Sequence, residues 1–301
     1  MTSSQVEVAG FPRPPRRESR SDRRRGGRLP RLARVITPLD VDALRARLVG
    51  PYASVAVVAS TESTNTDLAR SAARGAVDRT VLIADEQTAG QGRRGRTWIS
   101  PPGSGLYVSV LFRPVGVAPA RLPWLTLIAG VALVRLADSV GVKAALKWPN
   151  DLLLGQSGAK GAGVLAQNVG AAVVVGMGLN VAPLPEGVEP GPGGLVPTSL
   201  ADQGGTKLDR TDLAGRLLVH LGELEAAWRE SGGDPRPSGL LDEYRAHCST
   251  LGQRVRVELT GSSELVGTGH DIAVDGTLVV RRDDGVDHPV SAGDVVHLRP
   301  A

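Results

Sequence analysis

The segment from residue 90 to residue 98, GQGRRGRTW, constrains the fold of this 301-residue chain more than any other. It matches the pattern G-x-G-x-x-G, and it matches G-x-x-x-x-G-K-[ST] with Arg96 in place of the lysine. Both motifs need a helix directly after the loop, because the helix N-terminus holds the phosphate. Here a Pro-Pro-Gly turn at 101–103 follows, and then an apolar run at 106–112 that predicts a strand. The segment therefore joins two strands, which excludes the dinucleotide-binding and P-loop folds.

The same segment combines three glycines with three arginines. Backbone without side chains can close around an anion, and guanidinium groups bind its oxygens in pairs. A flexible glycine hairpin with solvated arginines would explain the glycines, but it would not explain so much positive charge in so short a loop. We therefore interpret residues 90–98 as an anion-binding loop.

A second motif is KWPND at 147–151, followed by a lysine at position 160. The chain has 35 Lys plus Arg, but its only lysines are Lys143, Lys147, Lys160 and Lys207. A compact ammonium on a flexible stem can follow a carboxylate as it becomes a phosphate ester. Isolated surface lysines on a hairpin are the alternative, but the neighbouring Asn150 and Asp151 favour a functional site.

These blocks resemble one family, the biotin–protein ligases. The family's signature segments correspond, in order, to STN at 63–65, the loop at 90–96, KWPND at 147–151, KGAGVL at 160–165 and GMGLN at 176–180. The resemblance covers about residues 36 to 301. Gln91 departs from the family pattern by replacing the first arginine of the loop, and Gln167 stands where the family often has a glutamate.

The resemblance implies an α+β fold with a mixed β-sheet and helices, a class II synthetase-like catalytic domain, and a small C-terminal SH3-like β-barrel. We expect a disordered Arg/Pro-rich tail at 1–35, a biotin- and ATP-binding domain at 36–250 and the barrel at 251–301. Some family members carry an N-terminal winged helix that binds a DNA operator. The first 35 residues are too few and too polar to form one, so no operator is expected.

The resemblance also implies the reaction. The biotin carboxylate attacks the α-phosphate of ATP and gives biotinyl-5′-AMP and pyrophosphate. A lysine of a biotin carboxyl carrier protein, such as that of acetyl-CoA carboxylase, then takes the biotinyl group and releases AMP. Mg²⁺ is expected to accompany ATP without a fixed protein site. The alternatives are a lipoate–protein ligase, which shares the adenylate chemistry, and a non-enzymatic nucleic-acid binder or repressor.

Residue by residue, the resemblance assigns three groups of side chains. The catalytic group, which holds the carboxylate or polarises the incoming amine, is Lys160, Arg93 and Asp151. The biotin-binding group is Ser63, Thr64, Asn65, Gln87, Gln91, Gly92, Arg93 and Lys160. The ATP- and adenylate-binding group is Arg94, Arg96, Trp98, Lys147, Asn150 and Asn180.

Three features of the predicted site also have a structural interpretation. Trp98 either lies near the adenine or packs in the core. Gly176, Gly178 and Asn180 either let a strand approach the ligand closely or serve close packing of sheet and helix. The Ser-Thr-Asn at 63–65 caps a helix, and this role is compatible with biotin recognition.

Hydrophobic periodicity predicts the elements. Helices are expected at 40–48, from a cap at 64–66 through 70–74, at 119–140 as the longest, at 208–230 and at 239–248. Strands are expected at 54–60 as a buried strand, and at 81–86, 106–112, 144–148, 152–154, 163–167 and 172–179. A Pro/Gly-rich surface loop is expected at 183–197. Short alternating strands are expected at 254–259, 264–274, 278–282, 286–290 and 294–298.

Composition bounds the remaining possibilities. Residues 1–35 contain ten arginines and three acidic residues, so this tail has a net charge of +7 while the whole chain has +4. It is interpreted as a solvated extension rather than a nucleic-acid contact, although weak salt-dependent polyanion contact fits its charge. A single cysteine excludes an internal disulfide and a cysteine-cluster metal site. We expect no membrane-spanning run and no secretory signal, and hence a cytoplasmic protein.

Overall fold

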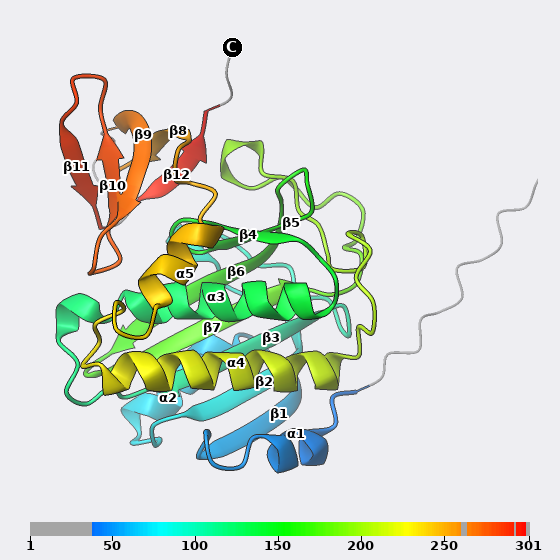
Figure 1. Ribbon diagram of the computed structural model, residues 1–301. Helices are drawn as coiled ribbons and strands as arrows, with labels where there is room; N and C mark the ends of the chain where they lie inside the picture. Colours follow the sequence, from blue (N-terminus) through cyan, green and yellow to red (C-terminus); the bar gives the residue numbers. More distant parts are fainter. Residues whose placement is uncertain (1–37, 260–263, 292, 299–301) are drawn as a thin grey trace, which may run out of the picture. The chain divides into compact units, whose positions relative to one another are not determined.

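The computed structural model describes residues 38–259, 264–291 and 293–298. Within them the chain forms a seven-stranded mixed sheet with helices, followed by a five-stranded antiparallel sheet (Figure 1). The expected α+β architecture with a small C-terminal β-domain is confirmed. The predicted tail at 1–35 lies outside the described residues, and the boundary at 250/251 stays a prediction.

The larger sheet has the strand order β1-β2-β3-β7-β6-β5-β4. Only β1 and β2 pair in parallel; every other neighbouring pair in this sheet is antiparallel. Its strands are β1 (Ser54–Thr61), β2 (Thr80–Gln87), β3 (Gly105–Phe112), β4 (Ala144–Lys147), β5 (Asp151–Leu154), β6 (Ala159–Val169) and β7 (Ala172–Asn180).

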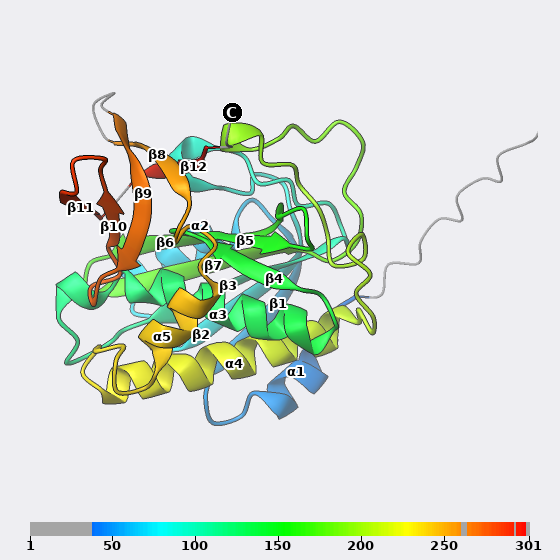
Figure 2. The same ribbon diagram turned by 45° about the horizontal axis from the view of Figure 1, so that its top comes forward.

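Helices cover both faces of this sheet. The α-helices are α1 (Val41–Arg47), α2 (Thr64–Ala73), α3 (Trp124–Ser139), α4 (Arg210–Glu230) and α5 (Leu240–His247). Helices α3 and α4 pack together on one face, and α2 lies on the other (Figures 1 and 2). Side chains alternate along β7 as a strand requires, so Val173 and Val175 join the core under α3 while Val174 packs with Leu68 of α2. The face that carries α2 is also the face that carries the candidate site.

Three predicted elements differ from the structure. Strand β1 is not buried, because it is an edge strand and most of its residues are partly or fully exposed. The cap of α2 is Ser63, whose extended backbone lets its hydroxyl accept the N–H of Thr66, so the helix already begins at Thr64. The segment at 119–140 begins with a 3₁₀ turn and becomes α3 only at Trp124, which leaves α4, at 21 residues, the longest described helix.

The prediction that no apolar run is long enough to cross a membrane was wrong, because one segment is long enough. Pro119–Ser139 is 21 residues long and apolar enough by composition. In the structure most of this segment is buried, because α3 packs against strands β4 to β7 of the sheet and against the neighbouring helices α4 and α5. A helix that is apolar on all sides is what such a central position requires.

The smaller sheet follows α5 and has the order β11-β10-β9-β8-β12. Its strands are β8 (Arg254–Glu258), β9 (Glu264–Ile272), β10 (Leu278–Arg281), β11 (Asp287–Val290) and β12 (Asp294–His297). Two buried tryptophans fix its β9–β10 connection: Trp124 donates to the carbonyl of Val274 at 2.8 Å, and Trp148 donates to that of Gly276 at 3.0 Å. The smaller sheet is therefore bonded directly to α3 and to the KWPND turn.

His297 of β12 provides a test of the packing between the smaller sheet and the KWPND turn. Its Nε2 lies 3.1 Å from Oγ1 of Thr250, which in turn accepts the backbone N–H of Trp148. Burial, and then the charge of Lys147, lower the pKa of His297 from 6.5 to about 4. Between pH 6.5 and about pH 4, His297 is therefore protonated in the unfolded chain but neutral in the folded chain. Protonation stabilises the unfolded chain, so the free energy of unfolding decreases as the pH falls through this interval.

We predict that thermal unfolding will show this loss as a Tm that falls between about pH 7 and about pH 4.5. His297→Gln keeps a polar group of similar reach but does not titrate, so its Tm should fall less over the same interval. An equal pH dependence in the two proteins would contradict a neutral, buried His297.

Candidate active site

A cavity of about 430 Å³ opens on the α2 face of the larger sheet. It lies within the size range of small-molecule sites. All the residues predicted to bind biotin line it, and so do five of the six predicted to bind ATP. Together with the predicted catalytic residues, fourteen predicted site residues line the cavity: Ser63, Thr64, Asn65, Gln87, Gln91, Gly92, Arg93, Arg96, Trp98, Lys147, Asn150, Asp151, Lys160 and Asn180.

One end of the cavity is uncharged and polar. The start of α2 presents Thr64, whose backbone N–H and hydroxyl both donate to Oε1 of Gln87, at 2.9 and 3.0 Å. Asn65 donates to the carbonyl of Leu165 at 2.9 Å. The hydroxyl of Ser109 lies 2.8 Å from Oγ1 of Thr64 and 2.6 Å from Oδ1 of Asn65. This network holds amide and hydroxyl groups in fixed orientations around the cavity end.

Ser109 was not among the sequence-predicted residues. It is fully buried in the middle of β3, where every residue is buried. A hydroxyl at such a position needs a polar partner, so a lone serine within an otherwise apolar strand was the signal that could have identified it.

Missing side chains on β6 and β7 create the floor of the cavity. A Cβ at Gly176 would collide with Oδ1 of Asn65, and one at Gly178 would collide with the indole nitrogen of Trp98. Gly163, which pairs with Gly178 across the strands, faces the same indole ring, 3.3 Å from its Cβ position. The two glycines of β7 therefore make room for the side chains of Asn65 and Trp98. At Gly176 the close approach is to Asn65 of helix α2, which is the packing of sheet and helix given as the alternative, and the approach of a ligand to these glycines stays a prediction.

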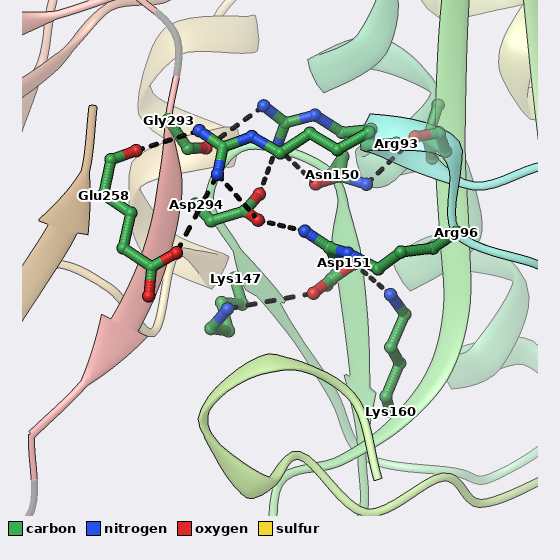
Figure 3. Close-up of polar contacts among 11 residues, drawn as sticks. Arg93, Arg96, Lys147, Asn150, Asp151, Lys160, Glu258, Gly293 and Asp294 are labelled. Atoms are coloured by element: carbon green, nitrogen blue, oxygen red, sulfur yellow. Dashed lines mark hydrogen bonds and ion pairs between the residues drawn. The ribbon is translucent and has the colours of Figure 1, made fainter. Parts of the chain in front are cut away.

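Two lysines share one carboxylate at the other end. Nζ of Lys160 lies 2.6 Å from Oδ1 of Asp151, and Nζ of Lys147 lies 3.8 Å from its Oδ2 (Figure 3). Burial lowers the pKa of Lys147, and the charge of Asp151 opposes that shift. Asn150 completes this corner by donating to the carbonyl of Val164 at 3.1 Å.

The glycine–arginine loop is a hairpin whose arginines meet the C-terminal sheet. Gly92 N–H donates to the carbonyl of Arg96 at 2.7 Å, and Arg94 adopts a left-handed backbone with φ of 55°. Arg93 donates to Oδ1 of Asn150 and to the carbonyl of Gly293, each at 3.1 Å (Figure 3). Burial lowers the pKa of Arg93, and the carboxylate of Asp294 is the largest opposing influence.

Asp294 is the second residue that the sequence reasoning missed. It begins β12, its side chain is 9% exposed, and it lies within ion-pair distance of Arg93, Arg94 and Arg96. No motif marks it, because it reaches the loop only through packing of the two sheets. Unlike the other predicted residues, Arg94 does not line the main cavity. It binds Glu258 and Asp294 and faces a neighbouring cavity of about 290 Å³.

The Pro/Gly-rich loop at 183–197 also borders the cavity, which its prediction as a plain surface loop did not anticipate. Leu184, Val188 and Glu189 line it, and the end of the loop is tied to β6 by the N–H of Lys160, which donates to Val196 at 2.8 Å. Among the described residues no group of three or more His, Cys, Asp or Glu side chains is arranged to hold a metal ion.

Comparisons with known proteins agree with this geometry. Residues 57–181 match the model of the biotin/lipoate A/B protein ligase family, and residues 250–298 match the model of the biotin protein ligase C-terminal domain. The two matches coincide with the larger sheet and the smaller sheet, respectively.

Relatives extend over most of the chain. It is 43% identical to the biotin–[acetyl-CoA-carboxylase] ligase of Mycobacterium tuberculosis, across 88% of this chain and 98% of the relative. It is 32% identical to the protein of the same name from Paracoccus denitrificans, across 76% of this chain and 95% of that one. Its fold matches the biotin protein ligase of Aquifex aeolicus in complex with biotin and ATP, with a TM-score of 0.66, 25% identity and coverage of 83% and 100%.

The glycine floor can be tested directly. Gly178→Ala should push the indole of Trp98 toward the cavity, and crowding of this kind costs about 1–3 kcal/mol of stability. Three of the four tryptophans are buried, so acrylamide quenching of tryptophan fluorescence should report mainly on Trp98. Quenching should increase in Gly178→Ala and increase less in Gly163→Ala. Unchanged quenching and an unchanged Tm would contradict the close approach.

Proposed function

The chain belongs to the biotin protein ligase family, and we propose that it attaches biotin to a specific lysine of a biotin carboxyl carrier domain by way of biotinyl-5′-AMP. One observation carries this proposal: a single cavity joins an uncharged polar end at Thr64 and Asn65 to a cationic end at Arg93, Arg96 and Lys160. Biotin has the matching shape, with a neutral ureido ring at one end and a carboxylate at the other.

The polar end is suited to the ureido ring. Oε1 of Gln87 is already occupied by Thr64, so the network fixes where the cavity presents donors and acceptors. A site built from buried, prealigned polar groups rejects ligands that leave them unpaired. This is the feature that favours biotin over lipoate, whose ring lacks the urea group.

In the first step the biotin carboxylate attacks the α-phosphate of ATP. A new P–O bond forms, the bond to pyrophosphate breaks, and negative charge on the departing group increases. Lys160 is placed to bind the carboxylate and then the phosphate of the adenylate, while Arg96 binds the departing phosphates. Mg²⁺ would accompany ATP and neutralise charge on the phosphates, while Asp151 and Asp294 are paired with Lys160 and Arg96.

In the second step Asp151 is our candidate for accepting the proton of the carrier's amine. Lys160 pairs with Oδ1 of Asp151 at 2.6 Å, so a ligand that takes over the ammonium of Lys160 frees this oxygen, while Lys147 stays 3.8 Å from Oδ2. The amine then attacks the mixed anhydride, an amide bond forms, and AMP leaves. In this order of steps, Asp151 becomes available as a base only when the adenylate is bound.

The partner proposed for this reaction is the carrier domain of a biotin-dependent carboxylase such as acetyl-CoA carboxylase, and the cytoplasm is the proposed location. The glycine–arginine loop would close the site and exclude water, which protects the anhydride from hydrolysis. The remaining assignments to ATP, including Arg94, Trp98 and Asn180, stay predictions.

The substrate assignment is tested with the full chain, MgATP and an acceptor domain, supplied with either biotin or lipoate. We expect one biotinyl group on one lysine of the acceptor, seen as a mass increase, and AMP rather than ADP as the nucleotide product. Lipoyl transfer without biotinyl transfer would show that the chain is the other kind of ligase in the family, and ADP would rule out the adenylate.

Lys160 is tested by biotin-dependent exchange of pyrophosphate into ATP, which reports the first step alone. Lys160→Ala should lose about 2–4 kcal/mol of transition-state stabilisation, the size expected for a donor aimed at developing charge. Lys143→Ala is the matched control, because Lys143 is an exposed lysine of the same region and does not line the cavity. Exchange near the wild-type rate in Lys160→Ala would remove it from the catalytic group.

A further inference from the structure

We infer that Asp294 of the C-terminal sheet is a positioning residue for the ATP-binding step, because it holds the guanidinium group of Arg96 at the cavity. The inference rests on the proposed function and adds a residue to it. It makes the C-terminal sheet one wall of the active site rather than an appendage.

The contacts of Asp294 are concentrated on one loop. Its Oδ2 pairs with Arg96 and lies 3.3 Å from Nη1 of Arg94, and its Oδ1 lies 3.7 Å from Nη1 of Arg93 (Figure 3). All three arginines belong to the glycine–arginine loop, and Asp294 lies about 200 residues further along the chain. Figure 3 shows the carboxylate between the arginines, with Glu258 further out on the C-terminal sheet.

The three arginines depend on Asp294 to different degrees. Arg93 is also held by Asn150 and by the carbonyl of Gly293, and Arg94 is also held by Glu258. Within the described part of the chain, the side chain of Arg96 pairs with Asp294 alone. Loss of this carboxylate should therefore release Arg96 first.

Electrostatic repulsion would move Arg96 away from the other arginines if the charge of Asp294 were removed. Three guanidinium groups repel one another, and the carboxylate is the charge that opposes this repulsion at their centre. Without it Arg96, which is 39% exposed, is free to turn toward solvent. With it the arginine cluster keeps excess positive charge beside the cavity, and unused donors of Arg96 remain for a phosphate.

The backbone of Asp294 is held within the smaller sheet. Asp294 pairs with Glu258 across β12 and β8, and its side chain is 9% exposed. At the other end of β12, His297 lies 3.1 Å from the hydroxyl of Thr250, and this hydroxyl accepts the backbone N–H of Trp148. Strand β12 thus touches the active-site region at both of its ends, so Asp294 has a fixed position from which to orient Arg96.

The test measures biotin-dependent pyrophosphate exchange of the full chain over a range of ATP concentrations. In Asp294→Asn, which keeps the shape but removes the charge, KM for ATP should rise about tenfold, the size of one charge-assisted hydrogen bond. The value of kcat should change much less, and Asp294→Glu should restore most of the affinity. Glu258→Gln is the matched control, because among the described residues the carboxylate of Glu258 has an ion pair with Arg94 and none with Arg96, and its KM should stay near that of the wild type.

A double mutant separates positioning from a general effect on folding. If Asp294 acts through Arg96, Arg96→Gln combined with Asp294→Asn should have the same KM for ATP as Arg96→Gln alone. Additive effects, accompanied by a lower Tm, would show that Asp294 only supports the fold, and this comparison remains valid even if Asp294→Asn is destabilised. A KM that is unchanged in Asp294→Asn, or lower because the carboxylate competes with phosphate, would also overturn the inference. Absence of exchange in the wild-type protein would instead count against the proposed function.

Discussion

Mutual repulsion among the cations of the active site is the constraint on which the rest of this structure depends. Arg93, Arg94, Arg96, Lys147 and Lys160 all lie around one region, and such a cluster is stable only when carboxylates separate its members. Asp151 serves the lysines and Asp294 serves the arginines. The five cations outnumber these two carboxylates, so the site retains the positive charge that the proposed nucleotide would need.

The two carboxylates come from different sheets, one from the middle of the described chain and one from near its end. Asp151 begins β5 of the larger sheet, whereas Asp294 begins β12 of the smaller one. Hydrogen bonds from Trp124 and Trp148 to the β9–β10 connection hold the smaller sheet in place. The arginine loop is therefore organised by a domain that contributes nothing to the sheet on which the ligand cavity opens.

Space for the ligand results from the alternation of side chains along β7. One face carries Val173, Val175 and Met177 into the core, while the other carries Gly176 and Gly178 beneath the cavity. The same strand can thus be part of a close-packed core and of a hollow site, because successive side chains point in opposite directions. Asn65 and Trp98 occupy the room that the glycines leave, so the floor is shaped by two elements distant in sequence.

The sequence by itself determined the α+β class and nearly every helix and strand, because hydrophobic periodicity is a local property. Its short motifs also identified most of the predicted residues that line the cavity. It placed Thr64, Arg93 and Lys160 in one site through the resemblance of ordered motifs. Only the tertiary structure decided that β1 is an edge strand, that Arg94 turns away from the main cavity, and that Ser109 and Asp294 support the site. Those outcomes depend on which segments pack against one another, and a carboxylate that meets an arginine about 200 residues away leaves no local pattern for the sequence to show.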